Sequence, residues 1–352
     1  TPDEELVRRA GVSMEAVQLL RSSEVVDLHL ESYIPPRIWG FDLAVRHDPP
    51  PLRGYFFGHL DFPRALDGGL TGAMWSIATN ILRTKRGRLA TLKKNVAGLA
   101  AAFDRTGGAI RPVRTHAEYV AARREGAHAA LIAVQGGNAL EAAGDAVADA
   151  VPDRLLTRVT LVHLSNSCYG GTSSPANVLT GERGLTNAGR ELVRQLDAAR
   201  IYVDLAHVSK RGFWDAVEVH DKGLPLLVTH TGVDGVKPMW RNVDDAQIRA
   251  VADTGGVIGI IVAENFLRPR GGPRDGRLLV DHMAHAIDAG GEDCVAIGTD
   301  YDGFIHPPKD LRDGALGYVR LVQHMLDRGF TDTRIRKILG DNFLRTFRRM
   351  RP

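Results

Sequence analysis

The residues best suited to chemistry begin at Val25, in the stretch V-V-D-L-H-L-E that ends at Glu31. Side chains alternate in direction along a β-strand, so Asp27, His29 and Glu31 are predicted to point to one face. Imidazole nitrogen and carboxylate oxygen are both ligands of zinc-like ions. The stretch therefore predicts two metal ligands, His29 and Glu31, at the carboxyl end of a strand. An edge strand with one polar face is the alternative.

Seven further short apolar runs follow this stretch, and helical patterns separate most of them. Eight strands that alternate with helices are typical of the α/β class and of a (β/α)8 TIM-like barrel. An open, doubly wound sheet is the alternative, but no Gly-x-Gly-x-x-Gly turn follows the first strand. The predicted strands are residues 25–31, 72–77, 130–135, 158–164, 202–207, 225–230, 257–262 and 295–300.

The remaining segments predict a single barrel domain over residues 1–352. One helix over residues 3–22 is an N-terminal addition, and residues 312–352 add C-terminal helices broken near Gly329 and Gly340. Residues 33–66, rich in Pro, Gly and aromatics, predict a long loop over the first strand's end. Further helices are predicted at residues 88–104, 138–150, 187–200, 209–220, 244–254 and 280–290.

The composition argues against several classes of partner. The 352 residues include 45 basic and 42 acidic side chains, a net charge of +3, without a Lys/Arg cluster. We therefore expect no nucleic-acid partner. No apolar run reaches the roughly 18 residues of a membrane span, so no membrane partner is expected. The N-terminus lacks a signal-peptide pattern, which favours a cytoplasmic location. Secretion is the alternative, because a chain that starts without Met is consistent with removal of an upstream segment.

Polar side chains stand at most of the predicted strand ends. In barrels of this kind, the active site lies at the carboxyl ends of the strands. A histidine hydrogen-bonded in the core explains any single case, but four of the 13 histidines at strand ends, beside two acids, favour a shared metal site. The residues concerned are His29, Glu31, Gln135, His163, His207, His230 and Asp300.

Motifs along nearly the whole chain resemble those of the membrane (renal) dipeptidase family, zinc dipeptidases of the amidohydrolase-like barrels. Each motif is short, and their order and spacing carry the resemblance. They are D-x-H-x-acid at 27–31, D-F-P-R-A-L-D-G-G-L-T-G-A-M-W-S at 61–76, I-A-V-Q-G-G at 132–137, V-T-L-V-H-L-S-N-S at 159–167, G-L-T-N-A-G-R-E-L-V at 184–193, V-D-L-A-H-V-S at 203–209, V-T-H-T-G at 228–232, R-N-V-D-D at 241–245, I-G-T-D-Y-D-G at 297–303 and K-I-L-G-D-N-F-L-R-T-F at 337–347.

The resemblance implies a role for each matching residue. His29 matches a histidine ligand on the first strand, and His207 and His230 match the two histidines of a second metal. His163 matches a histidine that contacts the substrate and the tetrahedral intermediate. Two further matches concern substrate and chemistry: Arg241 for the arginine that holds the substrate carboxylate, and Asp300 for the last-strand aspartate near the catalytic centre.

Two metal positions depart from the family pattern. Glu31 falls where the family has Asp, and it keeps a carboxylate. Gln135 falls where the family has a glutamate that bridges two zinc ions, and a neutral amide cannot replace that charge. Two divalent ions about 4 Å apart repel by roughly 16 kcal/mol at an effective dielectric near 20. We therefore expect zinc as the cofactor, with one tightly bound ion rather than two, and Gln135 as a doubtful ligand.

The implied activity is hydrolysis of a dipeptide, or a similar small amide with a free carboxylate, by metal-activated water. Three alternatives to this activity remain open. In the first, the pocket serves different chemistry on a modified amino acid or peptide in a biosynthetic pathway. In the second, the chain is a catalytically silent ligand-binding homologue, and in the third, Gln135 was engineered to inactivate the enzyme. The sequence leaves the oligomeric state open, with a homodimer among the options.

Overall fold

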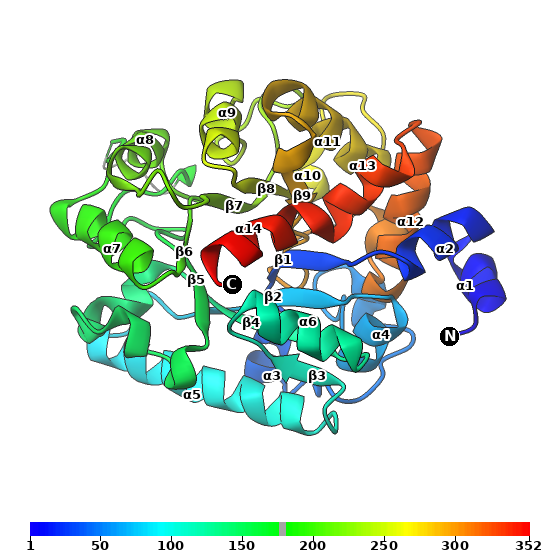
Figure 1. Cartoon of the computed structure of the whole chain (residues 1–352), viewed down its shortest axis with the longest axis horizontal. Coiled ribbons are helices and arrows are strands. Elements are labelled where there is room, and N and C mark those ends of the chain that lie inside the picture. Colours follow the sequence, from blue (N-terminus) through cyan, green and yellow to red (C-terminus); the bar gives the residue numbers. More distant parts are fainter. Residues whose placement is uncertain (176–180) are drawn as a thin grey trace.

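In the computed structural model, which describes residues 1–175 and 181–352, eight parallel strands close into a barrel surrounded by helices (Figure 1). Each strand in the ring pairs with the next, and the last pairs back with the first. The predicted (β/α)8 barrel is confirmed. Its strands are β1 (Val26–Leu30), β2 (Gly72–Ala78), β4 (His128–Gln135), β5 (Leu156–Thr160), β6 (Tyr202–Asp204), β7 (Leu227–Thr231), β8 (Val257–Ile260) and β9 (Val295–Ile297).

A short strand that the sequence did not indicate lies outside the ring. This strand, β3 (Ile110–Pro112), pairs with the first residues of β4. It uses the edge of β4 that β5 takes over from Ile132 onward. Three residues that include a proline are too few to produce an alternating pattern, which explains why the sequence did not predict β3.

Helices cover the outside of the barrel, and apolar side chains fill the layer between them and the strands. The helices between strands are α3 (Ile34–Trp39), α4 (Phe62–Asp67), α5 (Lys85–Asp104), α6 (His116–Arg124), α7 (Asn187–Ala198), α8 (Lys210–Val219), α9 (Asp245–Asp253), α10 (Glu264–Leu267) and α11 (Arg277–Gly290). Those at the chain ends are α1 (Asp3–Ala10), α2 (Met14–Arg21), α12 (Gly314–Asp327), α13 (Asp332–Arg336) and α14 (Asn342–Met350). No helix in the described ranges combines the length and the apolarity of a membrane span.

Several helical predictions were wrong in detail. The helix expected over residues 3–22 is two helices, because Gly11 adopts a left-handed φ of 69° and ends α1. Residues 138–150 form 3-10 turns, η2 (Gly137–Ala143) and η3 (Val147–Asp149), instead of one helix. The loop expected over residues 33–66 contains α3, η1 (Pro51–Gly54) and α4. Near Gly340 the helix does not break but widens into a π-helical turn, Lys337–Asp341.

The last helix closes one end of the barrel. Phe343 and Phe347 of α14 share an apolar cluster with Val26, Tyr202 and Val257, which stand at the amino ends of β1, β6 and β8. Figure 1 shows α14 crossing the middle of the strand ring. Because α14 covers the amino ends of the strands, the carboxyl ends form the face available to a ligand.

Candidate active site

A cavity of about 570 Å³ opens at the carboxyl end of the barrel. Its volume lies within the roughly 300–1,000 Å³ typical of small-molecule sites. Charged and polar side chains from different strands form its floor, and Ile38, Leu164 and Phe304 expose apolar side chains at its rim. The polar lining includes Glu31, Gln135, His163, His207, Arg241 and Asp300, all expected from the sequence.

Three histidines and Gln135 form a continuous chain of close contacts. The Gln135 Nε2 lies 2.7 Å from His163 Nε2 and 3.4 Å from His207 Nε2. His207 Nε2 in turn lies 2.9 Å from His230 Nε2. Gln135 ends β4 and His230 lies in β7, whereas His163 and His207 follow β5 and β6. The closure of the barrel therefore brings these four residues together.

His29 joins this group from β1. Its ring stacks on that of His230 with centroids 3.7 Å apart, and its Nε2 lies 3.4 Å from Glu31 Oε1 and 3.5 Å from Asp300 Oδ1. The prediction that Asp27 shares its face was wrong, because Asp27 accepts a hydrogen bond from Tyr318 of α12 on the outside of the barrel. The register of β1 against β2 shifts between Asp27 and Leu30, and such an irregularity turns His29 inward.

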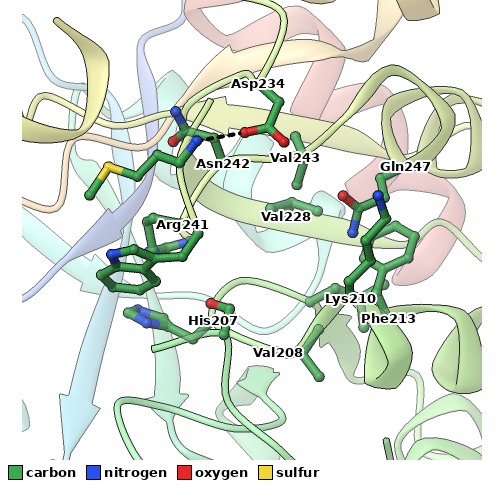
Figure 2. Close-up of a pocket in the computed structure, with 14 residues that line it drawn as sticks. His207, Val208, Lys210, Phe213, Val228, Asp234, Arg241, Asn242, Val243 and Gln247 are labelled. Atoms are coloured by element: carbon green, nitrogen blue, oxygen red, sulfur yellow. Dashed lines mark hydrogen bonds between the residues drawn. The ribbon is translucent and has the colours of Figure 1, made fainter. Parts of the chain in front are cut away.

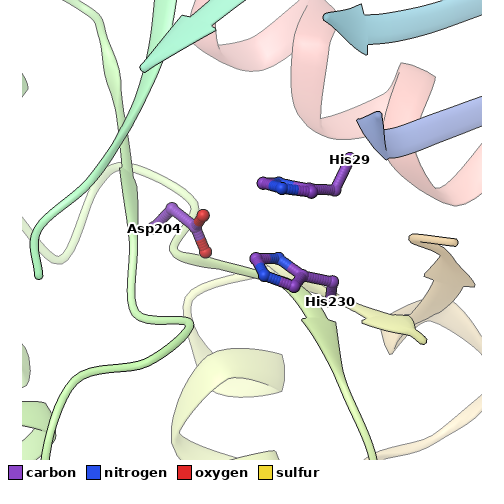
Figure 3. Close-up of side chains that lie close together, drawn as sticks. All are labelled: His29, Asp204 and His230. Atoms are coloured by element: carbon purple, nitrogen blue, oxygen red, sulfur yellow. The ribbon is translucent and has the colours of Figure 1, made fainter. Parts of the chain in front are cut away.

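Beneath the histidines, Asp204 at the end of β6 anchors the site. Ligand-type atoms of His29, Asp204 and His230 all lie within 4.8 Å of one another, and Figure 3 shows the carboxylate facing both rings. However, the fully buried Arg158 bridges two of the three. Its Nη1 donates to Asp204 Oδ2 at 3.1 Å, and its Nη2 lies 2.8 Å from His29 Nδ1. A guanidinium already provides the positive charge there, so we do not assign a metal between these three residues.

Arg241 lies on the loop after β7, and that loop is held by hydrogen bonds. Asp234 Oδ1 accepts a hydrogen bond from the Met239 amide at 2.9 Å (the dashed line at Asp234 in Figure 2), and Thr231 Oγ1 donates to the Arg241 carbonyl at 3.0 Å. The guanidinium donates through Nη2 to the His230 carbonyl at 2.5 Å. Arg241 and His207 line both the main cavity and a smaller one of about 160 Å³ beside it.

Burial dominates the electrostatics of these groups. It raises the pKa of Glu31 to about 8, although Arg158 and Arg37 act against this increase. Burial and the nearby Glu31 raise the pKa of Asp300 well above its ordinary value. Burial lowers the pKa of Arg241 to about 10, which still leaves its guanidinium charged at neutral pH.

Burial has the opposite effect on the pKa values of the histidines, which it lowers. Burial, followed by the charge of Arg241, lowers the pKa of His163 to about 4. Burial also lowers the pKa of His29, His207 and His230 well below the ordinary value for histidine. All four rings are therefore neutral at physiological pH, as metal ligation by imidazole requires.

Comparison with known proteins places this geometry in a family. The profile described as "Membrane dipeptidase (Peptidase family M19)" matches residues 14–351. The chain belongs to the membrane dipeptidase family. Peptidases of this family use metal ions, and the converging histidines of this membrane dipeptidase homologue are residues that can ligate such ions.

Individual relatives agree with the assignment. The chain resembles the solved structure of a dipeptidase described as a metallo peptidase of family M19, with a TM-score of 0.79 and 24% identity over 93% of this chain and 98% of the other. A metallo peptidase from Rhodobacter sphaeroides, solved with a phosphinate mimic of L-Ala-D-Ala, gives a TM-score of 0.77 and 24% identity over 93% and 99%. Both likenesses show the shared fold.

A curated relative, an "Uncharacterized protein in pqqA 5'region" of Klebsiella pneumoniae, is 37% identical over 180 residues. The aligned part spans 50% of this chain and 64% of that relative, whose description names no activity.

The residues of this homologue include side chains suited to ligating a metal ion. His207 and His230 converge through their Nε2 atoms. Buried polar atoms without a hydrogen-bond partner occur in both halves of the site: His207 Nδ1 and Gln135 Oε1 near His230, and His29 Nε2 and both carboxylate oxygens of Glu31 at the end of β1. An ion beside His29, Glu31 and Gln135 would instead meet a neutral amide and an imidazole held by Arg158. The structure therefore brings together all the residues expected at the site, but their surroundings differ between the two halves.

Sequence reasoning missed Arg158, Asp204 and Thr229, which hold the histidine rings from below. The available signal was an arginine inside an otherwise uncharged strand, since a buried charge needs a partner. A His-x-Asp pair in the loop after β1, His59 and Asp61, makes other contacts: His59 N donates to Asp302 Oδ1 at 3.0 Å, and Asp61 caps α4.

Proposed function

We propose that this chain is a metal-dependent hydrolase that cleaves a dipeptide, or a dipeptide-like small amide, with a free carboxylate. One observation carries the proposal. The neutral imidazoles of His163 and His207, the buried Arg241 and the Asp300 carboxyl group of raised pKa line the same cavity, and His230 Nε2 lies 2.9 Å from His207 Nε2. These are the groups that metal binding, carboxylate recognition and proton transfer require.

His207 and His230 are the residues that would hold a single divalent ion such as zinc. When bound, such an ion lowers the pKa of its water to about 7 and supplies hydroxide at neutral pH. The ring of His230 is fixed in the orientation that ligation needs, because its Nδ1 lies 2.9 Å from Thr229 Oγ1 and its Nε2 faces His207. Polar partners of this kind commonly orient metal-binding histidines.

The charge of the cavity favours a substrate with a carboxylate. Arg241 is charged and buried, yet the structure gives its guanidinium only the His230 carbonyl as a hydrogen-bond partner within the described residues. Arg37 and Arg83 line the same cavity. A planar guanidinium binds a carboxylate through two parallel hydrogen bonds, so Arg241 is suited to hold the substrate's C-terminus.

Asp300 and His163 would then act on the amide. The raised pKa of Asp300 makes its carboxylate a stronger proton acceptor, so Asp300 would orient the attacking water and carry its proton. His163 would contribute to stabilising the oxyanion. In this structure its Nε2 contacts the Gln135 amide at 2.7 Å, so a substrate oxygen that uses this nitrogen must displace Gln135.

Metal content and hydrolysis, measured on the same samples, test the proposal. We expect about one equivalent of zinc in the purified protein, and loss of hydrolysis of simple dipeptides on chelation, restored by zinc. His207→Asn and His230→Asn should lose both. His116→Asn is the matched control, because His116 contacts Phe347 of α14 at the opposite end of the barrel. A metal-loaded protein that hydrolyses no dipeptide would refute the activity, and metal content unaffected by either substitution would refute the site.

A further inference from the structure

The two stacked histidines of the site carry their protons on opposite nitrogens. Asp204 holds the two residues that determine these positions, Arg158 and Thr229, and it accepts five hydrogen bonds in all. Its Oδ2 accepts from Arg158 Nη1 at 3.1 Å, Thr160 Oγ1 at 2.6 Å and Thr229 Oγ1 at 2.7 Å. Its Oδ1 accepts from the backbone amides of Ala206 at 3.1 Å and Thr229 at 2.9 Å. All five partners donate, so Asp204 acts only as an acceptor.

The tautomer of His230 follows from Thr229. A threonine hydroxyl has one proton, and Thr229 donates it to Asp204. Thr229 Oγ1 must therefore accept from His230 Nδ1, 2.9 Å away. With the proton on Nδ1, the lone pair of Nε2 faces His207, and His230 is ready to bind a cation through Nε2.

The tautomer of His29 follows from Arg158, and it is the reverse. A guanidinium has donors and no acceptor. Arg158 Nη2 lies 2.8 Å from His29 Nδ1, so this nitrogen must accept, and the proton of the neutral ring is on Nε2. That N–H faces Glu31 Oε1 at 3.4 Å and Asp300 Oδ1 at 3.5 Å. A protonated imidazole nitrogen has no lone pair to offer a metal.

We propose that Arg158 is a positioning residue that holds His29 as an Nε2–H donor toward Glu31 and Asp300, and thereby withdraws it from metal ligation. The positive charge of Arg158 occupies the base of the site permanently, where Asp204 neutralises it. The bound ion is then confined to the half of the site that contains His207 and His230. This inference deepens the proposed single-metal function and rests on it only for the location of that ion.

The tautomers can be observed directly in the unsubstituted protein. In protein with ¹⁵N-labelled histidine, long-range ¹H–¹⁵N correlation spectra distinguish a protonated ring nitrogen from an unprotonated one. His29→Gln and His230→Gln, each lacking one set of signals, assign the spectra. The metal-free protein should show His29 protonated on Nε2 and His230 on Nδ1. His29 protonated on Nδ1 would overturn the inference, and this result needs no substitution at Arg158.

Two substitutions at position 158 provide a matched pair. In Arg158→Gln, the amide oxygen can accept from His29 Nδ1, so we expect the proton of His29 to move to Nδ1. In Arg158→Lys, an ammonium group again only donates, so the proton should stay on Nε2. An unchanged tautomer in folded Arg158→Gln, judged by its circular dichroism, would show that Arg158 does not control His29 and would overturn the inference.

Co²⁺ titration, followed by visible absorption, then measures the consequence for ligation. In a Gln135→Glu background, which restores a negative charge, we expect one Co²⁺ to bind. Adding Arg158→Gln should tighten a second Co²⁺ at least tenfold, whereas adding Arg158→Lys should not. Two tight ions with Gln135→Glu alone would overturn the inference. If the unsubstituted protein binds no ion but shows the expected tautomers, the proposed function fails and the role of Arg158 stands.

Discussion

Removing the Arg241 guanidinium should selectively weaken the binding of ligands that carry a carboxylate. The side chain is 4% exposed and remains charged at neutral pH, because burial lowers its pKa only to about 10. A unit charge pair at 4 Å is worth about 4 kcal/mol at an effective dielectric near 20. Truncating one partner of a buried, hydrogen-bonded charge pair costs about 2–5 kcal/mol. Arg241→Ala should therefore weaken binding by a factor between about 30 and several thousand.

The assay compares two ligands and separates recognition from general damage to the cavity. Calorimetry would give Kd values for a non-hydrolysable dipeptide mimic with a free C-terminal carboxylate and for the same compound as its amide. Arg241 also donates to the His230 carbonyl at 2.5 Å, so some loss common to both ligands is expected. The carboxylate ligand should lose at least about 2 kcal/mol more than the amide.

Arg37→Ala is the matched control, because Arg37 lines the same cavity and donates to the Ala78 carbonyl at 2.8 Å. It removes one charge from the same cavity, so it should reduce the difference between the two ligands by less than Arg241→Ala does. Equal losses for both ligands in Arg241→Ala, or a larger selective loss in Arg37→Ala, would refute the role of Arg241.

Three further expectations follow from other contacts. In Gln135→Glu, a negative charge about 4 Å from a divalent ion contributes roughly 8 kcal/mol of attraction at an effective dielectric near 20, before the cost of desolvation. The affinity for zinc, measured against a competing chelator, should therefore rise at least tenfold, and an unchanged affinity would contradict this expectation. Burial lowers the pKa of His128 to about 4, so the folded protein takes up a proton at a lower pH than the unfolded chain does. Up to about 3 kcal/mol of the folding stability present above pH 6.5 should therefore be lost as the pH falls to about 4. Urea unfolding of His128→Gln should show a smaller decrease over that range, and an identical pH profile would exclude His128 as the cause. A Cβ at Gly298 would lie 1.7 Å from the Thr229 carbonyl oxygen, so Gly298→Ala should cost about 1–3 kcal/mol or more and lower the Tm, which a wild-type Tm would contradict.

The eight ring strands could be predicted because parallel strands buried on both faces produce short, continuous apolar runs. Val257–Ile260, the first four residues of the run at 257–262, is buried throughout. The placement of the polar strand ends followed from the topology, since the carboxyl ends of parallel strands share one side of the barrel. Elements that depend on local backbone geometry were less predictable. Gly11 divides the first helix through a left-handed φ, and the segment after Gly136 forms 3-10 turns although its alanines favour an α-helix.

Contacts between residues distant in sequence explain what was missed at the site. Arg158 and His29 are 129 positions apart, and their contact exists only after the barrel closes. The alternation rule placed Asp27 beside His29, but the irregular register of β1 separates them. Residue types thus predicted a metal site, whereas the tautomer of each histidine depends on which nitrogen meets a donor.

Gln135 and Arg158 both disfavour the binding of a second metal ion, and replacing only one of them is not expected to create a second site. Gln135 removes a negative charge that would offset a second ion, and Arg158 adds a positive charge on the side where that ion would bind. Replacing Arg158 alone leaves Asp204 as a buried carboxylate without its counter-ion, and breaking a buried ion pair in this way costs about 3–5 kcal/mol. Replacing Gln135 alone adds a carboxylate beside His163 and His207 while His29 keeps its proton on Nε2. A site for two ions therefore requires both changes together, because each single change leaves either an unpaired charge or a histidine that cannot ligate.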